Sequence, residues 1–121
     1  MKTGRQLQQD IDEHHKRQRL LERVQRLVDK WQPILGVRIN EIHVRRMNSY
    51  WASINQGHSR MWVCQDLANV SNSLLEFVVV HELVHMRTDG HDPDFYALMD
   101  QHLPGWRKKH AAFAGPMTRH S

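Results

Sequence analysis

Three histidines and one glutamate in the second half of the chain have the types and the spacing needed to bind a metal ion and activate water. His81 and His85 are four residues apart, so on a helix both imidazoles lie on one face and can bind the same ion. His91 follows as a third nitrogen ligand. Glu82 is placed to reach a water on the metal rather than the metal itself. This set predicts one Zn²⁺ per chain and zinc-assisted hydrolysis.

The residues around this motif predict that its helix is buried. Apart from Glu76 and the three motif residues, nearly every residue in 74–86 is apolar, on all sides of the helix, and such a helix lies inside a protein. An ionised Glu82 there is costly unless a partner or a nearby cation compensates it. The chain is rich in histidine, but this motif with its third histidine is expected in only about 0.3% of shuffled chains. The alternative, two core histidines beside a stray glutamate, is therefore the weaker interpretation.

The composition predicts one domain spanning residues 1–121, with a loose tail at about residues 114–121. Cys64 is the only cysteine, which excludes an internal disulfide and a thiolate-rich zinc site. Residues at the start are polar and no apolar run reaches membrane-spanning length, so we expect a cytoplasmic protein without membrane contact. The net charge of +4 fits solvated helix faces, but it leaves a nucleic-acid-binding surface open. The oligomeric state is left open.

Hydrophobic periodicity predicts an α+β fold. A long amphipathic helix is expected over residues 6–31, ended by Pro33 and Gly36. Alternating residues predict a small three-stranded sheet from strands at 42–47, 50–54 and 60–64, with a tight turn at 55–58. The motif helix is expected over residues 74–87, capped by Ser71 or Ser73. Two short C-terminal helices follow, one beginning at Asp92 and Pro93 and one over residues 106–113.

Four segments resemble the YgjP-like zinc metallopeptidases, relatives of the SprT-like and Wss1-like proteases. They are MNSYWAS (47–53), EFVVVHELVH (76–85), GHDPDF (90–95) and LPGWR (103–107), and the resemblance covers roughly residues 20–113. It implies a minimal gluzincin-type, zincin-like fold in which three histidines from two helices hold the zinc. Family members usually carry Arg-Trp-Gly-Ser-Cys where this chain has YWASI (50–54), so any role of that arginine or cysteine is absent here.

The leading prediction for the reaction is hydrolysis of a peptide bond in a protein or peptide substrate. Glu82 takes a proton from the attacking water and hands it to the leaving amine. A further electrophile is expected, and Tyr96 is the candidate, with Tyr50 or His58 behind it; packing is the alternative role for Tyr96. An extended substrate could pair with the edge of the strand at residues 61–65.

Other polar residues near the motif have open roles. Gln65, Asp66 or Glu76 could orient the second nitrogen of a ligand histidine. The histidines outside the motif, among them His110, are interpreted as surface or packing residues.

Two other functions are compatible with the same histidines. YbeY-like endoribonucleases use His-Gly-x-x-His with a third histidine at the same position, but they have glycine where this chain has Glu82 and tend to have it where this chain has Thr88. A zinc-stabilised nucleic-acid-binding module without catalysis is the other alternative. It predicts that Glu82→Gln leaves function intact.

Overall fold

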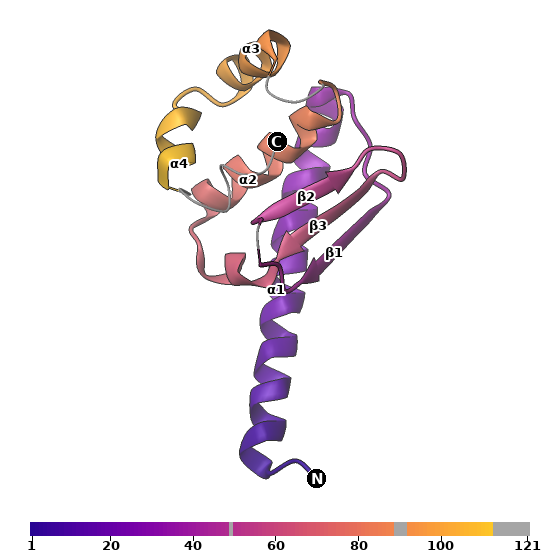
Figure 1. Ribbon diagram of the computed structural model, residues 1–121, viewed down its shortest axis with the longest axis vertical. Coiled ribbons are helices and arrows are strands. Elements are labelled where there is room, and N and C mark those ends of the chain that lie inside the picture. The colour runs from indigo at the N-terminus through magenta and orange to yellow at the C-terminus, as the bar shows by residue number, and fades with distance from the viewer. Residues whose placement is uncertain (49, 89–91, 113–121) are drawn as a thin grey trace.

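The computed structural model describes residues 1–48, 50–88 and 92–112. His91, Ser49 and the predicted loose tail lie outside the described residues. The elements follow the order α1, β1, β2, β3, a 3-10 helix η1, α2, α3 and α4, which confirms the α+β fold (Figure 1). No helix in the described part of the chain is long and apolar enough to cross a bilayer.

Helix α1 (Gly4–Leu35) is longer than the pattern predicts. Thr3 and Gln6 form a capping box at its start, which satisfies backbone groups of the first turn. Gly36 ends it in a left-handed conformation, φ 69°, which glycine adopts without steric cost. The prediction that Pro33 ends the helix is wrong. Pro33 lies in the last turn, where losing one backbone bond costs less than withdrawing the buried Leu35 from the core.

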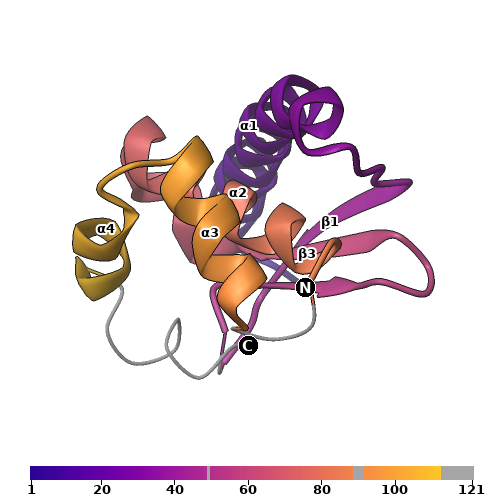
Figure 2. The ribbon, with the colours of Figure 1, turned by 90° about the horizontal axis from the view of Figure 1, so that it is seen from above.

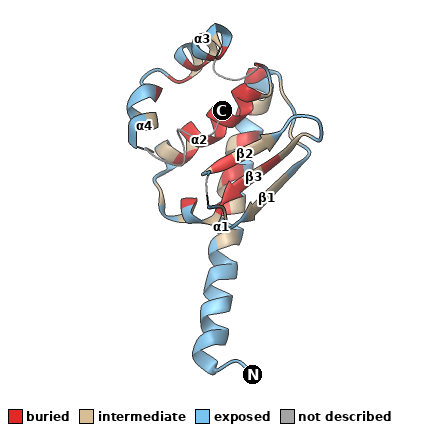
Figure 3. Ribbon diagram, in the orientation of Figure 1, coloured by how far each residue is buried: buried red, intermediate tan, exposed pale blue. Residues whose placement is uncertain are grey.

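Only the C-terminal half of α1 belongs to the globular body. Its buried residues recur at three- and four-residue steps and include Leu20, Val24, Val28 and Trp31. The N-terminal half projects beyond the rest of the molecule (Figures 1 and 3) and residues 1–16 are exposed. Arg23 of this half donates to the carbonyl oxygens of Ala68 and Val70 and to Asn72 Oδ1. Helix α1 therefore holds the chain just before α2.

The sheet consists of β1 (Glu41–Arg45), β2 (Ala52–Asn55) and β3 (Arg60–Cys64), in the order β1-β3-β2. Strand β3 is central, parallel to β1 and antiparallel to β2. The predicted edge pairing of a substrate with residues 61–65 is therefore wrong, because both sides of β3 already carry a strand. Strand β1 ends two residues before its expected limit and β2 begins two residues after its expected start. Both pair with β3, which stops at Cys64, where the chain enters η1 (Gln65–Asn69).

Helix α2 (Asn72–His85) begins and ends two residues before the predicted limits. The Ser71 hydroxyl accepts a bond from the Leu74 N–H at 3.2 Å, so Ser71 rather than Ser73 is the cap. Every residue from Phe77 to His85 is buried. The helix packs against α1, α3, α4 and β2, which confirms that it is the buried centre of the fold (Figure 3).

The two C-terminal helices follow the predicted pattern. Helix α3 (Pro93–His102) has Asp92 as its N-cap, which accepts a bond from the Phe95 N–H at 2.9 Å. Helix α4 (Trp106–Ala112) is joined to it by Trp106, whose indole N–H donates to Asp100 Oδ1. Seen from above, α4 lies at the opposite end of the molecule from β1 and β3, with α3 between them (Figure 2).

Candidate functional site

His81 and His85 lie together at the C-terminal end of α2. Their ring centroids are 4.7 Å apart with an interplanar angle of 79°. Both side chains are buried, with 1% and 6% exposure. The apolar residues that precede His81 place this turn of the helix in the core, so two imidazoles on one helix face are held in a confined space.

Glu82 is completely buried, with 0% exposure. Its Oε1 lies 3.5 Å from His81 Nδ1. A buried carboxylate is costly unless it is paired, hydrogen-bonded or close to a cation. Glu82 is therefore a buried carboxylate beside the His81 imidazole, and its role as a base next to a metal-bound water stays a prediction.

Phe95 of α3 covers both imidazoles. Its ring stacks on His85 at 4.7 Å and 25°, and it meets His81 at 5.3 Å with an interplanar angle of 80°. Phe95 is fully buried, so it closes one side of the histidine pair with an apolar wall. The sequence gives no sign that Phe95 packs on the His-Glu-x-x-His motif.

Tyr96 lies in the first turn of α3, next to Phe95. Its ring stacks on Trp106 at 6.1 Å and 25°, and the Arg107 guanidinium lies 5.9 Å from the ring centroid. The side chain is partly exposed. Tyr96 is thus one residue away from the side chain that covers the histidine pair, and it also has the packing contacts of the alternative interpretation.

His110 of α4 contacts the site, and sequence reasoning missed it. Its ring is nearly parallel to that of His81, at 6.3 Å and 13°, and it meets Phe77 at 6.1 Å. Burial lowers the pKa of His110, and the neighbouring His81 lowers it further, which favours the neutral imidazole. No spacing rule connects His110 to the motif, because the contact depends on how α4 folds back onto α2.

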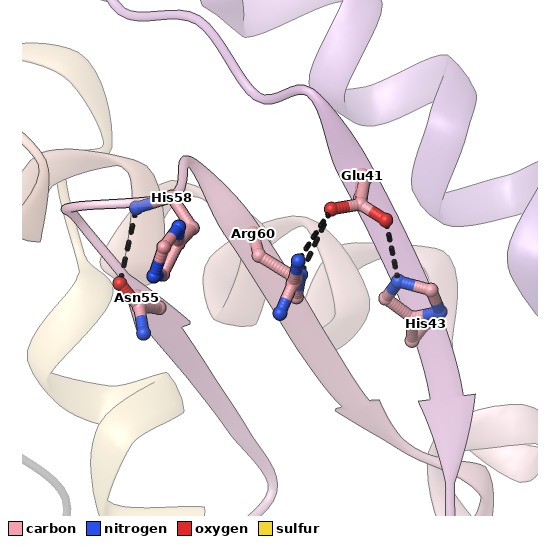
Figure 4. A network of polar contacts seen from close by, with 5 residues as sticks. All are labelled: Glu41, His43, Asn55, His58 and Arg60. Atoms are coloured by element: carbon pink, nitrogen blue, oxygen red, sulfur yellow. Dashed lines mark hydrogen bonds and ion pairs between the residues drawn. The ribbon is translucent and has the colours of Figure 1, made fainter.

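The turn between β2 and β3 reaches the same end of α2. The Gln56 amide nitrogen donates to the carbonyl oxygen of His85. His58, one of the secondary electrophile candidates, lies in this turn, and its backbone N–H donates to Asn55 Oδ1 at 3.1 Å (Figure 4).

Glu41 of β1 links β1 to β3 near this turn. It pairs with Arg60 across the sheet and with His43 on its own strand (Figure 4). The hydrogen bond from Arg60, followed by that from His43, lowers the pKa of Glu41. This network therefore joins β1 to β3 next to the turn.

Glu76, Gln65 and Asp66, the residues predicted to orient a ligand histidine, have other surroundings in the structure. Glu76 Oε2 accepts bonds from Lys30 Nζ at 2.8 Å and from Trp31 Nε1 at 2.9 Å, so its carboxylate joins α2 to α1. Gln65 and Asp66 instead line a surface hollow with Arg46, Met47 and Asn48. Glu76 is thus a structural residue, and the structure gives Gln65 and Asp66 no contact with the histidine pair in the described residues.

The donor set suits zinc as far as it is described. Two buried imidazoles one helical turn apart supply the nitrogen ligands that Zn²⁺ prefers. Among residues 1–48, 50–88 and 92–112, no three His, Cys, Asp or Glu side chains form a group that could hold a metal, and the predicted third ligand, His91, lies outside these ranges. Cys64 is buried in the sheet, with its thiol directed at the Met47 carbonyl.

Comparison with solved structures shows which proteins have a similar fold. The fold is similar to the metallopeptidase zymogen abylysin of Pyrococcus abyssi, with a TM-score of 0.68 and 17% sequence identity over 78% of this chain and 98% of that chain. It is also similar to the zymogen jannalysin of Methanocaldococcus jannaschii, with a TM-score of 0.65 and 18% identity over 74% of this chain and 91% of that chain.

Sequence comparison identifies the family. No curated protein matches the chain. Residues 2–114 match the YgjP-like metallopeptidase domain, which spans nearly the whole chain and includes the buried His-Glu-x-x-His helix. The chain therefore belongs to the YgjP-like family of metallopeptidases.

Proposed function

We propose that this metallopeptidase is a zinc enzyme in which His81, His85 and His91 hold the metal and Glu82 is the general base. The observation that carries the proposal is the fully buried Glu82 beside His81, whose ring in turn contacts the buried ring of His85. A carboxylate withdrawn from water needs a charged or hydrogen-bonding neighbour, and a metal-bound water beside His81 and His85 would be such a neighbour. When bound, zinc supplies Lewis acidity that activates water and polarises the scissile carbonyl.

Two described side chains, Glu82 and Phe95, have roles in the proposed reaction. Glu82 accepts the proton of the attacking water and delivers it to the nitrogen of the leaving amine, so one carboxylate serves both halves of the reaction. Phe95 covers the histidine pair, and exclusion of bulk water by such a wall strengthens the electrostatic interactions inside the site.

Strand β2 is the proposed docking edge for the substrate. It is the outer strand of the sheet on the side of α2, and its turn contacts His85 through Gln56. An extended peptide that pairs with this edge would run beside the motif helix, with affinity from backbone bonds. This replaces the predicted pairing with residues 61–65, which the central position of β3 rules out.

The test is the conservative substitution Glu82→Gln. It keeps the size of the side chain but removes the base, so peptide hydrolysis should fall by about 10²- to 10⁴-fold while zinc content stays close to one per chain. Glu22→Gln, an exposed change on α1, is the matched control and should keep full activity. Because abylysin and jannalysin, the two solved structures described above, are zymogens, we propose that this chain is also latent. Each variant is therefore assayed before and after limited proteolysis.

Three outcomes would contradict this proposal. Wild-type protein that binds no zinc would remove the metal site. Cleavage that survives Glu82→Gln would remove the general base. Retention of zinc by His81→Ala protein at the wild-type level would remove that residue from the ligand set.

Tyr96 is the proposed electrophile that stabilises the developing oxyanion. If it acts there, Tyr96→Phe should lower kcat by about 10- to 10³-fold and leave KM nearly unchanged, because only a transition-state interaction is lost. Since the phenyl ring keeps the contact with Trp106, the melting temperature should stay the same. Unchanged kcat in this variant would assign Tyr96 to packing.

A further inference from the structure

Most of the N-terminal half of α1 is in solvent, and only near its end do Glu13, Lys16 and Arg17 line a surface hollow with residues of η1. Residues 1–16 are exposed, and Leu20 is the first buried residue of the helix (Figure 3). We call residues 4–19 the arm. The arm continues the packed half of α1, but most helix stability in proteins comes from packing of an apolar face, so the arm gains stability if another surface covers one of its faces.

One face of the arm has the spacing of a coiled-coil seam. Leu7, Ile11, His14, Gln18 and Leu21 follow one another at alternating steps of four and three residues, which places them in the a and d positions of a heptad repeat. Leu7 and Ile11 are 51% and 48% exposed, and they are large apolar side chains that a partner helix would bury.

Two copies of the arm have complementary charges when they run antiparallel to each other. Asp10, Asp12 and Glu13 are followed by Lys16, Arg17 and Arg19. A parallel copy would place like charges side by side, whereas an antiparallel copy places the acidic group of each chain beside the basic group of the other. Asp10 and Arg17 are one heptad apart and flank the same side of the seam, the position from which antiparallel helices form charge pairs.

We propose that the arm binds the arm of a second copy of this chain as an antiparallel pair of helices. Leu7 and Ile11 of each copy pack in the seam, and Asp10 of each copy pairs with Arg17 of the other. The ion pair between Asp10 and Lys2 within one chain is solvent-exposed and therefore weak enough to be exchanged. The two globular bodies then lie at opposite ends of the helix pair, and this association is independent of the peptidase activity.

The first experiment measures mass by sedimentation of the full-length chain over a roughly hundredfold range of concentration, because association follows mass action. Wild type should double its mass as concentration rises, and Leu7→Gln/Ile11→Gln should remain a monomer with an unchanged circular dichroism melting temperature for its globular body. A wild type that stays monomeric, or a dimer that survives the double substitution, would overturn the proposal.

Charge reversal then tests the antiparallel pairing. Asp10→Arg and Arg17→Asp should each raise the dissociation constant by about tenfold or more, since two attractive pairs become repulsive. An equimolar mixture of the two variants should recover the dimer, because opposite charges then meet in both pairs. Asp12→Arg makes the same change in charge on the side of the helix away from the seam and should associate like wild type. Failure of the mixture to recover would contradict the pairing.

Cysteine cross-linking distinguishes the two orientations. In the antiparallel pair position 7 of one copy lies near position 18 of the other, so Leu7→Cys/Gln18→Cys should form an intermolecular disulfide under mild oxidation. Leu7→Cys alone should not, because equal positions are far apart. Efficient cross-linking of the single variant would show a parallel pair and overturn the proposed orientation.

Discussion

At the scale of single residues, Glu76 and Glu82 show that two carboxylates on one helix can have different functions. Glu76 faces α1, where Lys30 and Trp31 satisfy its carboxylate. Glu82 comes later in the same helix and lies beside His81 inside the core. The surroundings, rather than the residue type, separate a structural carboxylate from a proposed catalytic one.

Glu76 should contribute stability that depends on pH. Burial alone would raise its pKa, but the hydrogen bonds from Lys30 and Trp31 outweigh burial and hold the pKa below the ordinary 4.5. A lowered pKa in the folded state means that the stabilisation is complete above the unfolded value and is lost as pH falls through the folded value. Glu76→Gln should therefore lower the free energy of unfolding by about 1–2 kcal/mol at pH 7.

Urea unfolding at pH 7 and at pH 3 measures this effect. The difference between wild type and Glu76→Gln should be smaller at pH 3, because pH 3 lies below the ordinary pKa of 4.5 and the stabilisation from the lowered pKa of Glu76 is already being lost there. Glu22→Gln on the exposed face of α1 is the control and should give a smaller difference at pH 7. A difference that grows on acidification would contradict the assigned direction of the pKa.

At the scale of elements, capping decides where the motif helix begins. Ser71 accepts the Leu74 N–H, and the exposed Ser73 lies inside the first turn. Ser71→Ala should lower the free energy of unfolding by about 1 kcal/mol, because one of the unsatisfied N–H groups of the first turn loses its acceptor. Ser73→Ala is the matched control and should change it by only a few tenths. Thermal or urea unfolding measures the free energy of unfolding of both variants. Equal losses in Ser71→Ala and Ser73→Ala would contradict the assignment of Ser71 as the cap.

The elements could be predicted because their signals are local. Apolar spacing along α1, alternation in β3, and the Asp92-Pro93 start of α3 need only neighbouring residues. The order of the sheet could not be predicted in this way. Strand alternation shows which face is buried but not which strand lies alongside, so the central place of β3 required the structure.

Two parts of the site depended on tertiary packing and were missed for that reason. His110 is distant in sequence from His81, and only the return of α4 onto α2 brings the rings together. Gln56 reaches the His85 carbonyl from the turn of a hairpin. The spacing within His81, Glu82 and His85 was informative because one helix turn places these residues, whereas contacts between elements have no fixed spacing.

At the scale of the whole molecule, α2 is the element on which the others converge. Trp31 and Lys30 of α1 bind its Glu76, Phe95 of α3 covers its two histidines, and Gln56 contacts its C-terminal end. In a small domain with a modest core, a ligand that binds only the folded state adds a large share of the total stability. The proposed zinc site at the end of α2 should therefore influence the stability of the entire fold.

Removing the metal should lower the melting temperature of the whole domain. A ligand present at 100 times its Kd stabilises the folded state by about 2.7 kcal/mol, which corresponds to roughly 10 °C in a domain of this size. We expect the chelator EDTA to lower the Tm of the wild type by about that amount in a calorimetric scan, and added Zn²⁺ to restore it. His85→Ala should melt at one temperature with and without chelator, whereas Glu82→Gln should keep the full shift because its carboxylate is not a ligand. Equal Tm values for wild type in EDTA and in Zn²⁺ would show that no metal is linked to folding, and loss of the shift in Glu82→Gln would place that carboxylate among the ligands instead.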